Sequence, residues 1–205
     1  MSAPATTRRP RLLQVFLASA LLACAPFAAA EHWQIDEAAS SLGFVSVKNG
    51  AIVEGHRFTS LSGGVVGDTA SLSVDLASVD TAIEIRDERM RTMLFEVAEF
   101  PMAQVDIEID GAAIEALAVG ATLETQVSGT LSLHGVEAPI SAAVVATRTA
   151  ADAVTVASAR PVVIAAAPFG LGEGIERLRA VAGLAAITPS VPVSFSLRFT
   201  RAAAH

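Results

Sequence analysis

The chain has 205 residues, of which 21 are acidic and 14 basic, giving a formal net charge of −7 at pH 7. Arg8, Arg9 and Arg11 lie within the first 30 residues, which contain no acidic residue, so the rest of the chain carries 11 basic and 21 acidic residues and a net charge of −10. So acidic a surface repels nucleic acid and anionic lipid headgroups. Because Lys48 is the only lysine, a polybasic patch is excluded, and we expect no nucleic-acid partner.

The first residues have the features of an export signal. The three arginines precede the apolar run Leu12–Ala23, and the small residues Ala28–Ala30 stand directly before Glu31. This order is that of a secretory signal peptide. We therefore expect residues 1–30 to be removed as a signal peptide, residues 31–205 to form one domain, and the protein to be periplasmic or secreted. A membrane-spanning helix needs about 20 apolar residues. No stretch after residue 30 is apolar over that length, so we expect no transmembrane segment in the mature chain.

A second processing route is open at Cys24, the only cysteine of the chain. The segment Leu21–Cys24 resembles the lipobox of bacterial lipoproteins, in which the cysteine is lipidated and becomes the new N-terminus. A membrane-anchored lipoprotein, with Cys24 as the lipidation site, is therefore the alternative to soluble export.

Beyond Glu31 the dominant pattern is alternation of apolar and polar residues, which is typical of antiparallel strands with one buried and one solvated face. The alternation is clearest in four segments: Ser71–Leu76, Val105–Asp110, Leu123–Leu133 and Val191–Thr200. Less regular strands are expected in four more: Trp33–Lys48, Ala51–Val66, Ile140–Thr149 and Ala153–Ala166. Eight strands separated by turn residues predict a mainly β domain, either a sandwich or a barrel.

Two segments depart from the alternation and predict helices. In residues 85–99, Met90, Met93, Leu94 and Val97 recur at helical spacing, and Pro101 ends the segment. A short second helix is expected over residues about 173–182, before a glycine.

The inward residues of the strands are mostly aliphatic, and aromatic residues make up only 5% of the chain. An eight-stranded barrel is just wide enough either to be filled by its side chains or to hold one small ligand. Both alternatives, an apolar cavity and a packed core, are open at this point. If a cavity exists, we expect its lining to include Phe44, Leu72, Val74, Leu76, Met90, Met93, Leu94, Val105, Ile107, Leu131, Leu133, Val193, Phe195 and Leu197.

Few residues suggest catalysis or metal binding. The cluster Asp80, Arg86 and Asp87 is expected to be a hydrogen-bonded brace, with contact to a polar headgroup as the alternative. His56 and His134 are isolated and lack the spacing of metal ligands, and we expect both on solvated strand faces or at turns. No nucleophile–base pair is recognisable, so we expect neither an enzyme nor a metal site.

Several ordered motifs resemble the YceI-like family. Its signature block is similar to Ser78–Thr81, followed by Arg86-Asp87 and Phe100-Pro101. Three further segments resemble the opening strand, a paired hairpin and the closing strand of the family: Trp33–Asp36, Gly129–Ile140 and Pro192–Leu197. The resemblance covers nearly the whole chain after residue 31 and implies a lipocalin-like, eight-stranded antiparallel barrel with a helix against its side. It also implies a polyisoprenoid or quinone-like lipid inside the barrel and no other cofactor.

One segment departs from the family pattern. Many members carry a histidine and an aromatic-rich turn after the first strand, whereas this chain has Ser46–Ala51, with neither. The resemblance therefore implies the class of ligand but not its headgroup. We expect an exported protein that binds a hydrophobic small molecule. The alternative is a packed structural barrel that acts through its surface on an envelope partner, and a homodimer is a further open alternative.

Overall fold

The computed structural model describes residues 32–201, so the expected signal peptide and Cys24 lie outside the described residues. The strands are β1 (His32–Ile35), β2 (Ser41–Lys48), β3 (Ile52–Phe58), β4 (Leu61–Val66), β5 (Thr69–Asp75), β6 (Val79–Asp80), β7 (Met102–Glu108), β8 (Thr122–Leu133), β9 (Val136–Ala150), β10 (Ala153–Ser158), β11 (Val162–Ala165) and β12 (Ser190–Arg201). The helical elements are η1 (Glu37–Ala39), η2 (Leu76–Ser78), α1 (Glu84–Arg89), η3 (Met90–Leu94), α2 (Gly111–Glu115), η4 (Ala167–Phe169) and α3 (Gly172–Val181). In this part of the chain, no helix is both long and apolar enough to cross a membrane.

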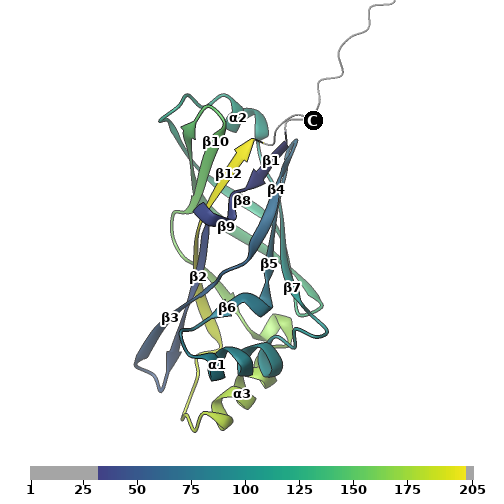
Figure 1. The fold of residues 1–205 in the computed structure, drawn as a ribbon, viewed down its shortest axis with the longest axis vertical. Helices are drawn as coiled ribbons and strands as arrows, with labels where there is room; N and C mark the ends of the chain where they lie inside the picture. Colours follow the sequence, from purple (N-terminus) through teal and green to yellow (C-terminus); the bar gives the residue numbers. More distant parts are fainter. Residues whose placement is uncertain (1–31, 202–205) are drawn as a thin grey trace, which may run out of the picture.

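Eight strands close into an antiparallel barrel (Figure 1). Hydrogen bonding runs in the order β1-β4-β5-β7-β8-β9-β10-β12, and β12 pairs again with β1 to complete the ring. Trp33 is a member of the closing pairs, since it is in register with Val65 of β4 on one side and with Arg201 of β12 on the other. The predicted mainly β, eight-stranded antiparallel barrel is confirmed.

Several of the predicted strands are broken into two pieces that pair with different neighbours. The segment expected as Trp33–Lys48 is β1 and β2, separated by the short helix η1, and Ala153–Ala166 is β10 and β11. The first pieces belong to the closed ring, whereas β2 and β11 extend it by pairing with the N-terminal part of β12. The wall is therefore longer on this side, as the descending β2–β3 hairpin in Figure 1 shows.

Two glycines permit close approach of neighbouring strands. A Cβ atom on Gly64 would lie 2.2 Å from the Trp33 carbonyl oxygen, and one on Gly129 would lie 1.9 Å from the Asp106 carbonyl oxygen. Neither distance can be tolerated by a real side chain, so only glycine fits at these positions. This close approach explains why the Gly129–Ile140 motif begins with a glycine.

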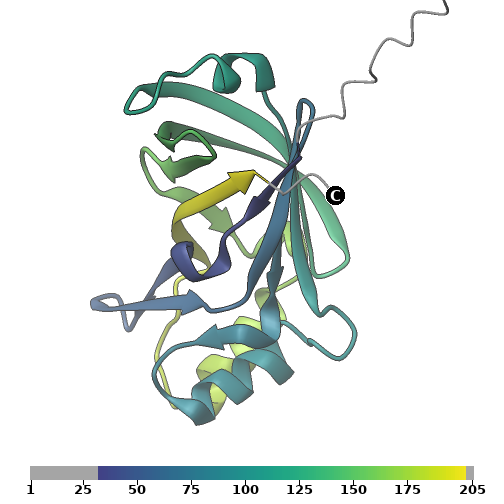
Figure 2. The same cartoon turned by 45° about the horizontal axis from the view of Figure 1, so that its top comes forward.

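Helices α1, η3 and α3 lie together at one end of the barrel, hereafter the helix end, and α2 lies at the other, the α2 end (Figures 1 and 2). The short second helix is found over Gly172–Val181, close to its predicted bounds. The first helix is shorter than the predicted 85–99. It becomes a π-helix at Met90, marked by the hydrogen bond from the Phe95 N–H to the Met90 carbonyl, and Glu96 adopts a φ of 49°, which ends it. The helix α2 has no counterpart in the sequence predictions.

Candidate ligand-binding cavity

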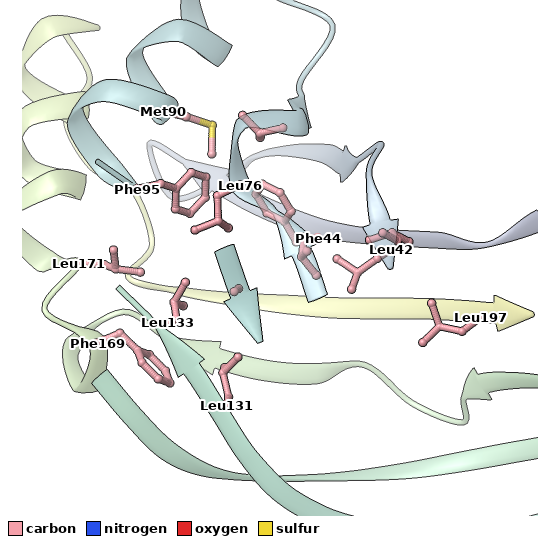
Figure 3. Close-up of a cluster of buried hydrophobic side chains, with 14 of the residues drawn as sticks. Leu42, Phe44, Leu76, Met90, Phe95, Leu131, Leu133, Phe169, Leu171 and Leu197 are labelled. Atoms are coloured by element: carbon pink, nitrogen blue, oxygen red, sulfur yellow. The ribbon is translucent and has the colours of Figure 1, made fainter. Parts of the chain in front are cut away.

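The barrel encloses an apolar cavity of about 880 Å³. This volume lies in the upper part of the range for small-molecule sites, about 300–1,000 Å³. Its wall is made by the inward residues of the strands, because alternate side chains of each strand point to the same face. Figure 3 shows Phe44, Leu76, Phe95 and Leu131 converging on this interior from different elements.

The cavity includes nearly all of the side chains for which a lining position was predicted. Phe44, Leu72, Val74, Leu76, Met90, Leu94, Val105, Ile107, Leu131, Leu133, Val193, Phe195 and Leu197 all line it. Their contact with a ligand stays a prediction.

Met93 is the exception and is not part of the wall. Its backbone carbonyl accepts a hydrogen bond of 2.7 Å from Arg177, and a Cβ atom on Gly174 would lie 2.8 Å from the same carbonyl oxygen. Met93 therefore lies where η3 packs on α3. The π-helical turn changes the spacing of side chains from that of the α-helix assumed for the prediction.

Sequence reasoning missed a further group of lining residues. Alternation within Leu123–Leu133 and Val191–Thr200 marks Leu123, Val127, Val191 and Phe199 as inward residues, and Ile175 lies in the predicted second helix. The remainder come from the less regular segments, in which the periodic signal is weak. This group includes Trp33, Leu42, Phe58, Val65, Leu123, Val127, Ile140, Val154, Leu171, Ile175, Val191 and Phe199.

The two ends of the cavity differ in chemistry. At the helix end, buried Met90, Phe95 and Leu171 form the wall. At the α2 end, four carboxylates are among the lining residues: Asp68, Glu108, Asp110 and Glu115. Alternation within Val105–Asp110 assigns Glu108 and Asp110 to the solvated face of the strand. Both do lie at exposed positions, but the strand ends at Glu108 and they also border the cavity. The lining within residues 32–201 has no lysine or arginine.

The carboxylate of Glu115 ties the last residue of helix α2 to the barrel wall. Glu115 Oε1 accepts a hydrogen bond of 2.9 Å from the Trp33 indole Nε1, and Glu115 Oε2 accepts one of 2.9 Å from Arg201. The buried guanidinium of Arg148 lies 3.5 Å from Glu115 Oε2. The Arg148 and Arg201 guanidinium carbons are also 5.1 and 4.6 Å from the Trp33 ring centroid, at cation–π distance. We call these four residues the α2 latch.

The predicted brace joins the strand before α1 to the helix. It also involves three residues that were not predicted, namely Thr81, Glu54 and Arg57. Arg86 donates from Nε and Nη2 to the Thr81 hydroxyl and carbonyl, at 2.7 and 2.6 Å, and from Nη1 to Glu54 at 2.8 Å. The Asp87 carboxylate accepts from both the backbone N–H and the hydroxyl of Thr81. Asp80 pairs instead with Arg57, at 2.7 Å. The backbone N–H of Ala82, and then Arg57, lower the pKa of Asp80.

The three brace residues do not line the cavity. Their side chains form hydrogen bonds and ion pairs with Thr81, Glu54 and Arg57, so the geometry favours the bracing role over contact with a headgroup. Lys48 adds a second ion pair to Glu54, at 2.6 Å. The hydrogen bond from Lys48, with Arg86 adding to it, lowers the pKa of Glu54.

His56 corrects one prediction, because it is buried rather than solvated. Its Nε2 lies 2.8 Å from the Ser46 hydroxyl, and its ring is 5.1 Å from that of Phe44, which lines the cavity. Burial, and then the charge of Arg86, lower the pKa of His56. His134 lies at a turn with a φ of 53°, as predicted. Within residues 32–201, no three His, Cys, Asp or Glu side chains are grouped as a metal site would need.

Comparison with solved structures places the barrel among known relatives. A polyisoprenoid binding domain from Saccharophagus degradans, implicated in plant cell wall breakdown, is 42% identical, with a TM-score of 0.81 over 83% of this chain and 98% of the domain. Two others share the fold at low identity. BcnA of Burkholderia cenocepacia is 19% identical, with a TM-score of 0.62 over 80% of this chain and 98% of BcnA. The YCEI protein of Campylobacter jejuni is 13% identical, with a TM-score of 0.53 over 73% of this chain and 85% of that protein.

A search of curated proteins found no match. The YceI-like domain matches residues 33–199, from the tryptophan of the α2 latch to the last inward phenylalanine of β12. The match spans the whole closed barrel and most of the chain. The chain therefore belongs to the YceI-like domain family.

Proposed function

We propose that this protein is an exported binding protein that holds one elongated hydrophobic lipid, of the isoprenoid type, inside its barrel. The observation that carries the proposal is the apolar cavity of about 880 Å³. The 42% identical domain from Saccharophagus degradans, described as polyisoprenoid binding, supports the isoprenoid class of ligand.

Burial of the hydrocarbon chain supplies the binding energy. Each CH₂ group transferred from water to an apolar site contributes about 0.8 kcal/mol. Several isoprene units can therefore offset the loss of translational and conformational freedom on binding. The alternative of a packed barrel acting only through its surface is disfavoured, because a packed barrel leaves no such space.

We infer that the ligand lies with its polar end at the α2 end. At the helix end the lining includes the buried apolar side chains Met90, Phe95 and Leu171, whereas the α2 end has the carboxylates Asp68, Glu108, Asp110 and Glu115. Carboxylates accept hydrogen bonds and repel anions. A hydroxyl or another neutral headgroup therefore fits this end better than a phosphate or diphosphate. We propose binding without catalysis, since the wall offers hydrogen-bond acceptors but no nucleophile next to a base.

The test is to purify the protein from its native host and extract it into organic solvent. We expect about one lipid with an isoprenoid chain per barrel, identified by mass spectrometry. A complementary test is titration of the lipid-free protein with all-trans-retinol, a fluorescent isoprenoid alcohol. Absence of a stoichiometric lipid in the extract, together with failure to bind retinol, would contradict the proposed function.

A further inference from the structure

The barrel wall has an open seam between β9 and β11. Residues Val136–Ala142 of β9 pair with β8 only, and β11 pairs with β12 only. Two strand edges thus face each other without hydrogen bonds between them in the described chain. Toward the α2 end, the seam stops at the last backbone hydrogen bond between its two sides, which runs 2.8 Å from the Ala159 N–H to the Ala143 carbonyl. Toward the helix end, the seam stops at Phe169, whose carbonyl oxygen lies 3.2 Å from His134 Nδ1.

The seam contains a space of about 450 Å³. We call it the side slot. Its walls are β9 from Ala138 to Ala143 and β11 from Val162 to Ala165, and prolines stand at its borders: Pro139, Pro161 and Pro168. Proline lacks a backbone N–H and is common where a strand edge must stay unpaired. The prolines therefore favour strand edges that stay unpaired at the slot.

The side slot adjoins the main cavity across the wall. Residues of both faces of β11 line it: Val163 and Ala165 are exposed to solvent, whereas Val162 and Ile164 line the main cavity. Val162 and Ile164 therefore separate the slot from the cavity. On β9, Ile140 and Ser141, which point to opposite faces of the strand, likewise border both the slot and the cavity.

A polar bridge crosses the part of the slot nearer the α2 end. With its amide oriented to satisfy both groups, Gln126 of β8 donates to the Ala142 carbonyl at 3.1 Å and accepts from Arg160 at 2.9 Å. Arg160 is exposed, in the connection between β10 and β11. The bridge thus ties the two sides of the seam through side chains that can separate without disturbing a backbone ladder.

The other exits are more firmly held. At the helix end, Met90, Phe95 and Leu171 are buried, and the brace fixes α1 to the wall. At the α2 end, Glu115 of the α2 latch holds the helix down. Opening a paired seam elsewhere would break backbone hydrogen bonds and leave their groups unpaired. Widening the slot breaks none between its two edges.

We propose that the side slot is the passage through which the hydrocarbon chain of the ligand enters and leaves the barrel. This inference rests on the proposed lipid binding. The polar head would remain at the α2 end while the chain moves sideways through the slot, so the chain need not thread lengthwise past α2. Segments without cross-strand bonds also open at low cost, as a passage requires.

The test closes the slot reversibly in the full chain. Ser141→Cys and Val163→Cys place thiols on the two sides of the slot at exposed positions, and Cys24→Ser removes the natural thiol. A bifunctional thiosulfonate then joins the two thiols through a reducible link. Uptake and release of all-trans-retinol are followed by stopped-flow fluorescence. We expect both rates to fall by about tenfold or more in the linked protein and to recover on reduction, with little change in equilibrium affinity.

The matched control joins two strands that are already paired. Ser73→Cys and Gln104→Cys face each other across β5 and β7, away from the cavity. The same link there should leave both rates unchanged. Ala165→Trp provides a second test without cross-linking, because an indole at this exposed position narrows the slot and should slow both rates.

The outcomes separate the two proposals. If the linked slot and the Ala165→Trp variant exchange retinol at the unmodified rate, or if the control link slows exchange equally, the passage lies elsewhere and this inference is wrong. If the unmodified protein binds no retinol, the proposed function fails instead.

Discussion

Trp33 and Glu115 are 82 positions apart in the chain, and a 2.9 Å hydrogen bond from the indole Nε1 to the carboxylate joins them at the α2 end of the cavity. Trp33 belongs to the strand pair that closes the barrel, and Glu115 ends the helix that covers it. One contact therefore connects closure of the wall to closure of the cavity.

Glu115→Ala should loosen α2 and destabilise the protein by about 1–3 kcal/mol, because buried Arg148 and the indole both lose an acceptor. Trp33 is the only tryptophan, so its emission should shift to longer wavelength as water reaches the ring. Urea unfolding and the emission spectrum measure the two effects. Glu176→Ala, which removes an exposed ion pair with Arg179, is the control and should change stability by less than about 1 kcal/mol. An unchanged spectrum for Glu115→Ala would mean that the α2 latch does not shield Trp33.

Val105→Trp should fill part of the cavity and weaken retinol binding by about tenfold or more, because Val105 lines the wall and a bulky ring competes for the same space. Gln104→Trp, on the outward face of the same strand, should bind retinol as the unmodified protein does. Equilibrium fluorescence titration measures both. Equal affinity in the two variants would place the ligand outside the barrel.

Glu108→Gln should make the protein more tolerant of anionic lipids, because it removes one of the carboxylates that border the α2 end of the cavity. In competition against retinol, geranylgeraniol should bind the unmodified protein more tightly than geranylgeranyl diphosphate, by about tenfold. The gap should narrow in Glu108→Gln and stay the same in Asp106→Asn, which lies outside the cavity lining on the same strand. Tighter binding of the diphosphate to the unmodified protein would refute the neutral headgroup.

His56→Gln should reduce the loss of stability on acidification. Burial lowers the pKa of His56 below its ordinary value of 6.5, so the unfolded chain binds a proton at that position more readily than the folded protein does. The free energy of unfolding should therefore decline as the pH falls through 6.5, until the lowered pKa is reached. Urea midpoints measured across this range should decline less steeply in His56→Gln. His32→Gln, at an exposed position of β1, is the control and should keep the slope of the unmodified protein.

The mass of the mature protein tests the proposed export and its lipid-anchored alternative. We expect a protein that begins at Glu31 and carries no lipid at its N-terminus. A mass that corresponds to a lipidated Cys24 would instead establish the anchored form.

The strands with the strictest alternation could be predicted closely from the sequence. In Ser71–Leu76 and Leu123–Leu133 the apolar residues at alternate positions are buried or half-buried, so the period of two identifies the strand and its inward residues together. The α3 helix was equally predictable, because its apolar spacing ends at a glycine. The helix predicted for residues 85–99 was too long, since the π-helical turn at Met90 and the left-handed Glu96 leave no mark on a periodic pattern.

Alternation in the sequence assigned the aliphatic side chains to the buried faces of about eight strands, and the resemblance to the YceI-like family implied that these strands close into a barrel. Only the tertiary structure decided that the interior is hollow, because a cavity depends on how far apart opposite walls stand. Contacts between distant segments are likewise set by strand register and closure, which bring Glu115 to Trp33, bury His56 and leave β9 and β11 without hydrogen bonds to each other. Local patterns encode the face of a residue, whereas its partners across the barrel are fixed only when the wall closes.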